Sequence, residues 1–316
     1  MVDNFEQIRY LLKFDNPGDC YYLQLLRRQA DDPHTDGKAD PNYHGNMHSR
    51  SIKDYLISSL DYYDQKKDEI KKICDTFNVR AYIRLNKRTY FSIAMAILKH
   101  IVEQLTSGQT FNSPFSLIAS AAGNANAAGK EKTWILDLDE EYVPFKDDIY
   151  KMIVECEPYN KMFEEWRMSS IPGSTEQDYV NAFITVSFSE IQTKHGKHII
   201  SKPFNTAALT KKWNQYCESN GVTMPLPRMF NDPEDKFTIF ELTDVYLPIA
   251  DEFASFLPEY EKTQSDSNKI SFVVPKMTDW EVHMLDFYWK GNCLKNKRWM
   301  RMFDIHKDNP TILYVP

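Results

Sequence analysis

The stretch Trp134–Glu141 constrains this chain more than any other part of its sequence. A strongly apolar run ends there in two aspartates spaced by two, Asp137 and Asp139, so in a β-strand both carboxylates lie on the same face. Two acids held side by side repel each other, and a divalent cation is the usual compensation, because Mg²⁺ bound with nucleotide phosphates takes one or two protein carboxylates. The alternative is a strand that ends in a solvated acidic turn with Glu140 and Glu141. The sequence therefore predicts a strand-end acidic pair that either binds metal or faces water.

A second informative stretch, Phe188–Phe204, has the pattern of a strand, a tight turn and a second strand. Gly196 falls at the turn, where a positive φ is expected. The side chains near it offer a hydroxyl, two ammonium groups and an imidazole, which together suit a triphosphate. These candidate nucleotide-binding residues are Thr193, Lys194, His198 and Lys202. The alternative interpretation is an exposed basic hairpin.

An acidic D-x-D strand followed by a T-x-x-G-x-H hairpin resembles the archaeo-eukaryotic primase superfamily, which includes primase-polymerases encoded by phages and plasmids. The resemblance covers roughly Thr133–Pro316 and implies an RRM-like catalytic sheet. It implies that Asp137 and Asp139 are catalytic ligands of Mg²⁺ or Mn²⁺ and that His198 contacts the phosphates of the incoming nucleotide. The implied reaction is two-metal-ion, template-directed polymerisation of NTPs or dNTPs on single-stranded DNA.

A third acidic residue on a later strand completes the site in that family. Asp308, just before the apolar run Thr311–Val315, is the preferred candidate for a third catalytic metal ligand, ahead of Asp304. The other candidates are Asp232, Asp235 and Asp244. The resemblance also implies a replicative helicase or a single-strand-binding protein as a partner. No zinc-binding cysteine cluster and no helicase P-loop accompanies the motifs, which fits a stand-alone catalytic subunit or a diverged relative.

Hydrophobic periodicity predicts an α+β fold. We expect a mainly helical N-terminal region at residues 1–115 packed on the core, a flexible loop at 116–132, and an RRM-like mixed-sheet module with flanking helices at 133–316. The expected helices are Ser51–Tyr63, Asp68–Phe77, Thr89–Leu105, Lys146–Cys156, Thr206–Glu218, Thr243–Leu257 and Thr278–Tyr288. The expected strands are Val79–Leu85, Thr133–Leu138, Ala182–Phe188, His198–Ser201 and Thr311–Val315.

Basic residues also gather on and after the expected strand Val79–Leu85. They are Arg80, Arg84, Lys87 and Arg88. Interleaved with Tyr82 and Tyr90, they would suit phosphate contacts and base stacking with a nucleic acid. The alternative is a polar strand face followed by the first turn of a helix.

The net charge of −7 argues against a surface coated in positive charge for generic nucleic-acid binding, but it leaves room for a local basic groove. The five cysteines are scattered and form no C-x-x-C pair, so the sequence indicates neither a structural zinc site nor a disulfide framework. No apolar stretch is long enough to span a membrane, and no secretory signal is recognisable. We therefore expect a cytoplasmic protein without membrane contact.

Two other functions fit parts of the sequence. Lys194-His195-Gly196 resembles the K-x-x-G or K-x-H-G element that carries the covalent nucleotide in RNA ligases, although the later acidic and lysine strands of that class are not clear. A catalytically inactive module that binds nucleic acid or protein would keep the sheet, with Asp137 and Asp139 as ordinary strand-end acids. Divalent metal binding at these aspartates separates the enzyme from the inactive module.

Overall fold

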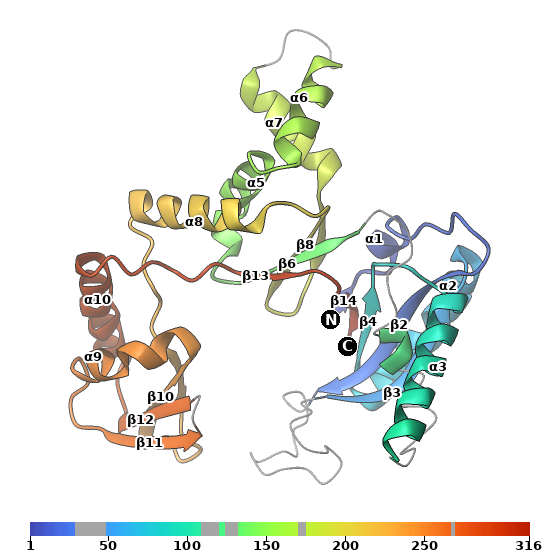
Figure 1. Cartoon of the computed structure of the whole chain (residues 1–316). Coiled ribbons are helices and arrows are strands. Elements are labelled where there is room, and N and C mark those ends of the chain that lie inside the picture. Colours follow the sequence, from blue (N-terminus) through green and yellow to red (C-terminus); the bar gives the residue numbers. More distant parts are fainter. Residues whose placement is uncertain (29–48, 109–119, 124–131, 170–174, 267–268) are drawn as a thin grey trace. The chain divides into compact units, whose positions relative to one another are not determined.

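The computed structural model describes residues 1–28, 49–108, 120–123, 132–169, 175–266 and 269–316. The chain is α+β with antiparallel sheets and divides into two compact units (Figure 1). Unit 1 comprises Met1–Asn205 together with Phe303–Pro316, and unit 2 comprises Thr206–Met302. Unit 2 is therefore an insertion between two parts of unit 1.

The first sheet of unit 1 has the strand order β1-β14-β4-β2-β3, with the short β5 paired to β2. Its strands are β1 (Val2–Asp3), β2 (Asp19–Arg28), β3 (Ser49–Ile57), β4 (Arg80–Arg84), β5 (Arg88–Thr89) and β14 (Pro310–Val315). Because β14 pairs with both β1 and β4, the two ends of unit 1 meet in one sheet.

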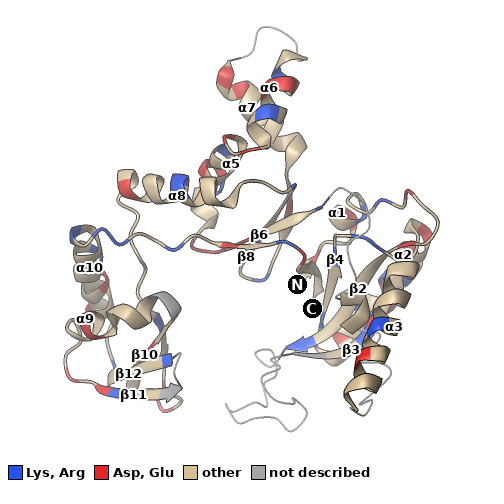
Figure 2. Ribbon diagram, viewed as in Figure 1, with Lys and Arg blue, Asp and Glu red and all other residues tan. Residues whose placement is uncertain are grey.

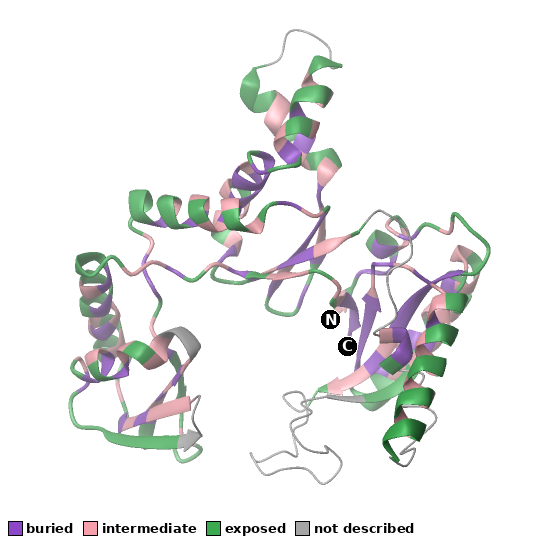
Figure 3. Ribbon diagram, in the orientation of Figure 1, coloured by how far each residue is buried: buried purple, intermediate pink, exposed green. Residues whose placement is uncertain are grey.

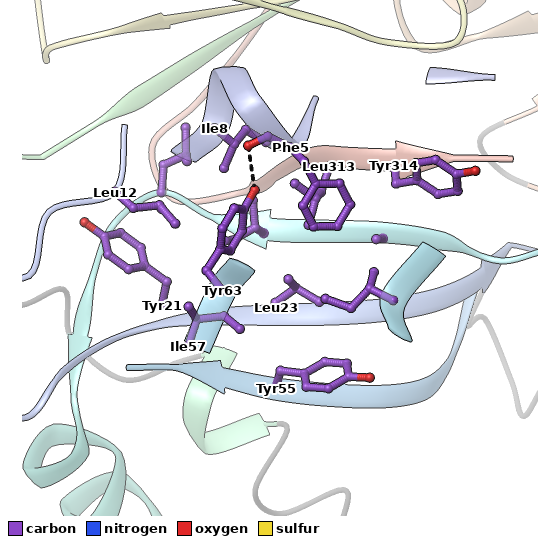
Figure 4. Packing of buried hydrophobic residues seen from close by; sticks show 14 of the residues in the cluster. Phe5, Ile8, Leu12, Tyr21, Leu23, Tyr55, Ile57, Tyr63, Leu313 and Tyr314 are labelled. Atoms are coloured by element: carbon purple, nitrogen blue, oxygen red, sulfur yellow. Dashed lines mark hydrogen bonds between the residues drawn. The ribbon is translucent and has the colours of Figure 1, made fainter. Parts of the chain in front are cut away.

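Helices pack on both faces of this first sheet. They are α1 (Phe5–Arg9), α2 (Leu60–Phe77) and α3 (Tyr90–Ser107). Strand β2 is apolar on both sides: Leu23 packs in the cluster that contains Tyr63 of α2, whereas Tyr22 packs with Ile93 of α3. The Tyr63 hydroxyl donates to the carbonyl oxygen of Phe5 at 2.9 Å, which ties α2 to α1 (Figure 4). As a result β2 and β4 are largely buried (Figure 3).

The second sheet of unit 1 has the order β13-β6-β8-β7. Its strands are β6 (Trp134–Asp139), β7 (Ser189–Gln192), β8 (Gly196–Ser201) and β13 (Asp304–His306). Strands β6 and β7 each run antiparallel to β8, which lies between them, so β6 and β7 are parallel to each other. The connection between them contains η2 (Val143–Phe145), α5 (Lys146–Val154), α6 (Tyr159–Met168) and α7 (Glu176–Ser187). This arrangement is a split β-α-β unit.

The two faces of β6 differ in character. Leu136 and Leu138 are fully buried, and Asp137 and Asp139 alternate with them, so the two acids point to the opposite face of the sheet. Acidic residues accordingly mark the end of β6 in Figure 2. Strand β6 therefore presents both carboxylates on one side while its leucines anchor the other.

Unit 2 has its own sheet, of order β11-β12-β10-β9, and its own core. Its elements are α8 (Thr206–Asn220), β9 (Arg228–Asn231), β10 (Phe237–Thr243), η3 (Asp244–Ile249), α9 (Ala250–Ala254), β11 (Glu261–Asp266), β12 (Lys269–Pro275) and α10 (Asp279–Lys295). Phe240, Phe253, Phe272 and Trp289 are fully buried in that core. Helix α10 begins with a capping box formed by Thr278 and Glu281, as its sequence pattern indicates.

The expected α+β class is confirmed, but two expected elements are wrong. Residues 51–57, expected as the start of a helix, belong to strand β3, because this strand is buried on one face by Tyr55 and Ile57 and partly on the other by Leu56. Ala182–Phe188, expected as a strand, lies mostly in α7, whose N-terminus is fixed by a capping box of Thr175 and Asp178.

The observed units also divide the chain differently from the expected regions. The N-terminal region contributes five of the six strands of the first sheet. The expected module at 133–316 is interrupted by unit 2, and its last strand, β14, joins the first sheet. Most of the expected loop at 116–132 lies outside the described residues, although 120–123 are helical. No helix in the described part of the chain is long and apolar enough to cross a membrane.

Candidate functional site

Three polar residues lie side by side across the second sheet of unit 1. Asp137 on β6 is paired in register with His198 on β8 and, on its other side, with Asp304 on β13. Residues directly opposite in antiparallel strands point to the same face with Cα atoms about 4.5–5.5 Å apart. Asp139 follows on the same face of β6. We call these four residues the acidic row.

Asp137 is the centre of the acidic row. Its Oδ1 lies 3.3 Å from Nε2 of His198, and its Oδ2 lies 4.0 Å from Nε2 of His306 on β13. Burial acts to raise the pKa of Asp137, but the hydrogen bond from His198 and the charges of both histidines hold that pKa below its ordinary value. The Asp137 side chain keeps 37% of its surface exposed, so a ligand can reach a carboxylate that stays ionised.

A contact on the side of the imidazole away from Asp137 fixes the orientation of His198. Its Nδ1 lies 2.8 Å from the hydroxyl of Thr311 on β14, and Thr311 has no exposed surface. With Nδ1 engaged in this way, Nε2 faces Asp137. The contact also links the two sheets of unit 1, since Thr311 belongs to the first and His198 to the second.

Asp139 experiences the opposite electrostatic environment. Partial desolvation, together with the negative charges of Asp137 and Asp304, raises the pKa of Asp139 above its ordinary value. Like charges gathered on one face of a sheet therefore disfavour ionisation of Asp139. A bound cation would relieve this repulsion.

Gly196 allows β6 and β8 to approach each other at Asp139. A Cβ atom built on Gly196 would lie 2.9 Å from Cα of Asp139 and closer still to the carbonyl oxygen of Leu138. The positive φ expected for Gly196 is wrong, because it is not among the glycines with a positive φ. A glycine is needed here to leave space for the neighbouring backbone.

The chemistry of the acidic row fits a hard divalent cation. Mg²⁺ and Mn²⁺ prefer carboxylate oxygens, and Asp137, Asp139 and Asp304 supply three carboxylates on one face. Within the described ranges, no group of three or more His, Cys, Asp or Glu side chains is already gathered closely enough to hold a metal ion. The fit therefore rests on the donor types and on the repulsion at Asp139.

The structure places the other expected nucleotide-binding residues at and beyond the β7–β8 turn. Thr193 is buried, and its backbone N–H donates to the carbonyl oxygen of Gly196 at 3.0 Å. Lys194 is exposed in the turn. Lys202 follows β8 and is exposed at the opposite end of that strand from Gly196. Of this set, only His198 lies in the acidic row.

Asp308, the preferred third acid, lies elsewhere. Its Oδ2 lies 2.5 Å from Nη2 of Arg88, and its Oδ1 accepts from the Asn86 side chain at 3.1 Å. Its carbonyl oxygen also accepts a hydrogen bond from Arg84. The register of β13 instead brings Asp304, the second-choice candidate, beside Asp137.

The remaining candidates for a third acid lie in unit 2. Asp232 accepts backbone N–H groups of Lys236 and Phe237 in the β9–β10 turn. Asp235 pairs with Lys276. Asp244 begins η3, and its side chain is outside the described set.

The basic cluster at Arg80–Arg88 is mainly internal. Arg88 has no exposed side-chain surface, and Arg80 is buried at 8%. Lys87 pairs with Asp15 at 2.6 Å and with Asp19 at 2.9 Å. Arg84 retains 20% of its side-chain surface. The structure therefore leaves Arg88 no surface with which to contact a nucleic acid, because its guanidinium is enclosed with Asp308.

Sequence reasoning missed His306 and Thr311 and gave Asp304 second place. The signal that could have found two of them is the alternation Asp304-Ile305-His306, which repeats on β13 the pattern of polar residues flanking an apolar one seen at Asp137-Leu138-Asp139.

Comparison with protein-family models, curated proteins and solved structures gives no match to this chain.

Proposed function

We propose that unit 1 is a primase-like nucleotidyltransferase that uses Mg²⁺ or Mn²⁺ to polymerise NTPs or dNTPs along a single-stranded DNA template. The observation that carries this proposal is the acidic row, in which Asp304, Asp137 and His198 stand in register on three adjacent strands. The D-x-D strand, the histidine hairpin and a third acid on a later strand follow the order that the resemblance to the primase superfamily implies.

The topology of the second sheet supports an RRM-like module. In the order of the chain its strands are β6, β7, β8 and β13, and in space β13 lies beside β6 and β8 lies between β6 and β7. A split β-α-β unit with the fourth strand added beside the first is the arrangement of RRM-like and ferredoxin-like sheets. The second crossover would be the connection that contains α8 and the rest of unit 2.

Asp137, Asp139 and Asp304 would hold the cation, which when bound supplies charge neutralisation to the triphosphate and lowers the pKa of the attacking hydroxyl. Asp137 is suited to this role because it remains ionised beside two imidazoles. His198, oriented by Thr311, would donate its Nε2–H to a phosphate oxygen in place of its contact with Asp137. Lys194, which is exposed in the β7–β8 turn, would add to nucleotide binding, together with the buried Thr193 beside it.

The test is template-dependent synthesis by the full chain. We would supply Mg²⁺ or Mn²⁺, a single-stranded template, and labelled ribo- and deoxynucleotides, and compare the wild type with Asp137→Asn/Asp139→Asn. Removing such electrostatic stabilisation should lower the rate by about 10²–10³-fold or more. Asp147→Asn on α5 is the control, because Asp147 is exposed outside the acidic row.

Two results would count against the proposal. One is that the wild type makes no oligomers and shows no metal-dependent nucleotide binding in calorimetry. The other is that synthesis persists in the double variant. The first result would leave a catalytically inactive binding module as the better account of this chain.

A further inference from the structure

A cleft of about 730 Å³ opens in unit 1 at the ends of β6 and β8 away from Asp139 and Gly196. Tyr21, Leu85 and Ile200 line it and are buried. Besides the acids Asp15 and Asp19, its lining contains lysines from four separate segments. They are Lys13, Lys87, Lys132 and Lys202.

Among the described residues, no acid forms an ion pair with three of these lysines. Lys87 is engaged by Asp15 and Asp19. By contrast, Lys13, Lys132 and Lys202 are exposed and form no ion pair with any described residue. In a chain of net charge −7, three such ammonium groups around one cleft make a local site for an anion.

The cleft and the acidic row lie along the same pair of strands. Ile200 lines the cleft and is two residues from His198 on β8. Thr133, which directly precedes β6, also lines the cleft and is four residues from Asp137. At about 3.3 Å per residue, this separation is roughly 13 Å. The cleft and the acidic row therefore occupy neighbouring stretches of β6 and β8, with the buried Ile135 between Thr133 and Asp137.

We propose that this cleft binds the phosphate backbone of a single nucleic-acid strand and directs it to the acidic row; this inference rests on the function proposed above. Lysine ammonium groups contact phosphates without reading sequence, which suits a strand of arbitrary sequence. Tyr10 lines the cleft and is 80% exposed, so its ring is available to stack on a base. Lys202 is expected from the sequence to bind the nucleotide; in this proposal it contacts the nucleic-acid strand instead.

The experiment measures binding of a fluorescently labelled single-stranded DNA oligonucleotide by anisotropy, without metal or nucleotide, at several salt concentrations. The test variant is Lys13→Gln/Lys132→Gln/Lys202→Gln. The control is Lys72→Gln/Lys161→Gln/Lys211→Gln, which removes the same charge from exposed lysines outside the cleft. Thermal melting of each protein checks that the fold is retained.

We expect the cleft variant to bind the oligonucleotide at least about 10-fold more weakly than the wild type at low salt. The slope of log affinity against log salt should become shallower by about 2, because each phosphate contact on a single strand contributes about 0.7. The control variant should keep both the affinity and the slope of the wild type. Equal binding by the cleft and control variants would overturn the proposal.

Two further measurements separate this proposal from the catalytic one. Asp137→Asn/Asp139→Asn should not lower the metal-free affinity for the oligonucleotide, and the cleft variant should keep the Mn²⁺ binding of the wild type. If Asp137→Asn/Asp139→Asn binds Mn²⁺ as well as the wild type while the cleft variant loses affinity for the oligonucleotide, the catalytic proposal is wrong and the cleft proposal stands. If the cleft variant loses affinity for free ATP but not for the oligonucleotide, the cleft is a nucleotide site and the strand assignment is wrong.

Discussion

Asp304 stands directly opposite Asp137 across the β13–β6 pair, whereas Asp308, only four residues further on, forms an ion pair with the buried Arg88. Two neighbouring aspartates of one short segment are thus separated into two roles by strand register. Asp304 adds a third carboxylate to the acidic row. Asp308 neutralises the guanidinium of Arg88, whose side chain has no exposed surface.

We therefore predict that Asp304→Asn mainly lowers activity and that Asp308→Asn mainly lowers stability. Asp304→Asn should lower nucleotidyl transfer by about 10²-fold or more and leave the melting temperature close to that of the wild type. Asp308→Asn should lower the free energy of unfolding by about 2–3 kcal/mol, because it leaves the Arg88 charge enclosed without a carboxylate. Chemical denaturation and the template assay, run on both variants, measure the two effects. Loss of activity in a fully stable Asp308→Asn protein would restore Asp308 as the third ligand.

Asp139→Asn should make the metal-free protein more stable. The pKa of Asp139 is raised in the folded state, so at neutral pH its ionised form destabilises that state, and this cost disappears as the pH falls through the folded pKa. Removing the charge should raise the melting temperature at pH 7 by about 1–3 °C, since Asp139 is largely exposed. The gain should shrink toward pH 4. A melting temperature that falls at pH 7 would show that the acidic row is not electrostatically strained.

Thr311→Val should loosen His198 without removing it. The buried Nδ1 of His198 then loses its partner, which should cost about 1–3 kcal/mol of stability, and we expect synthesis to slow by about 3–10-fold through weaker nucleotide binding. Thr311→Ser keeps the hydroxyl and should restore the nucleotide KM. A purely structural role would instead lower stability in Thr311→Val while leaving the KM and the pH profile of the surviving enzyme unchanged.

Gly196→Ala should disrupt the pairing of β6 with β8 beside Asp139. The added methyl group would meet the backbone of Leu138 and Asp139, which cannot move aside as a flexible side chain could. We expect a loss of about 2–3 kcal/mol in the free energy of unfolding, together with loss of activity. Gly291→Ala in α10 is the matched control, because a Cβ there meets nothing within 4 Å and alanine favours the helix. Equal stability of the two variants would contradict the close approach at Gly196.

The stability of the β7–β8 hairpin depends on the ionised carboxylate of Glu190 and should therefore fall at acid pH. Burial acts to raise its pKa, but hydrogen bonds from Lys146, Lys197 and Tyr150 outweigh that effect and lower the pKa to about 2. Its contribution to stability is therefore complete above the ordinary glutamate pKa and is lost as the pH falls toward 2. Glu190→Gln should lower the melting temperature at pH 7 and reduce its decline between about pH 5 and 2. Melting curves of the two proteins across this pH range make the comparison; parallel declines would rule this role out.

The sequence was sufficient where a local pattern decides the structure. The apolar run ending in two aspartates spaced by two predicted β6 and the shared face of its acids, and the helix expected over Thr89–Leu105 is observed as α3, with Thr89 as its N-cap. Both depend only on neighbours within a few residues. The α+β class follows from the same kind of local signal.

Sequence reasoning failed where distant packing decides. Tyr55, Leu56 and Ile57 are apolar on consecutive positions because β3 packs on both faces, and this erased the period of two that identifies a strand. The strand expected at Ala182–Phe188 is instead part of α7, a helix that begins at the capping box of Thr175 and Asp178 and continues to Ser187. The position of Asp304 beside Asp137 depends on the pairing of β13 with β6, two strands that are far apart in the sequence.

Because unit 2 is inserted within unit 1, the residues of the acidic row are synthesised at different times. During synthesis Asp137, Asp139 and His198 leave the ribosome before Thr206–Met302, and Asp304 leaves only afterwards. Until then β6 has an open edge where β13 will pair, and the first sheet still lacks β14 and, with it, the Thr311 hydroxyl that orients His198. A nascent chain interrupted within unit 2 therefore carries an incomplete acidic row, and both sheets are completed together once β13 and β14 have been synthesised.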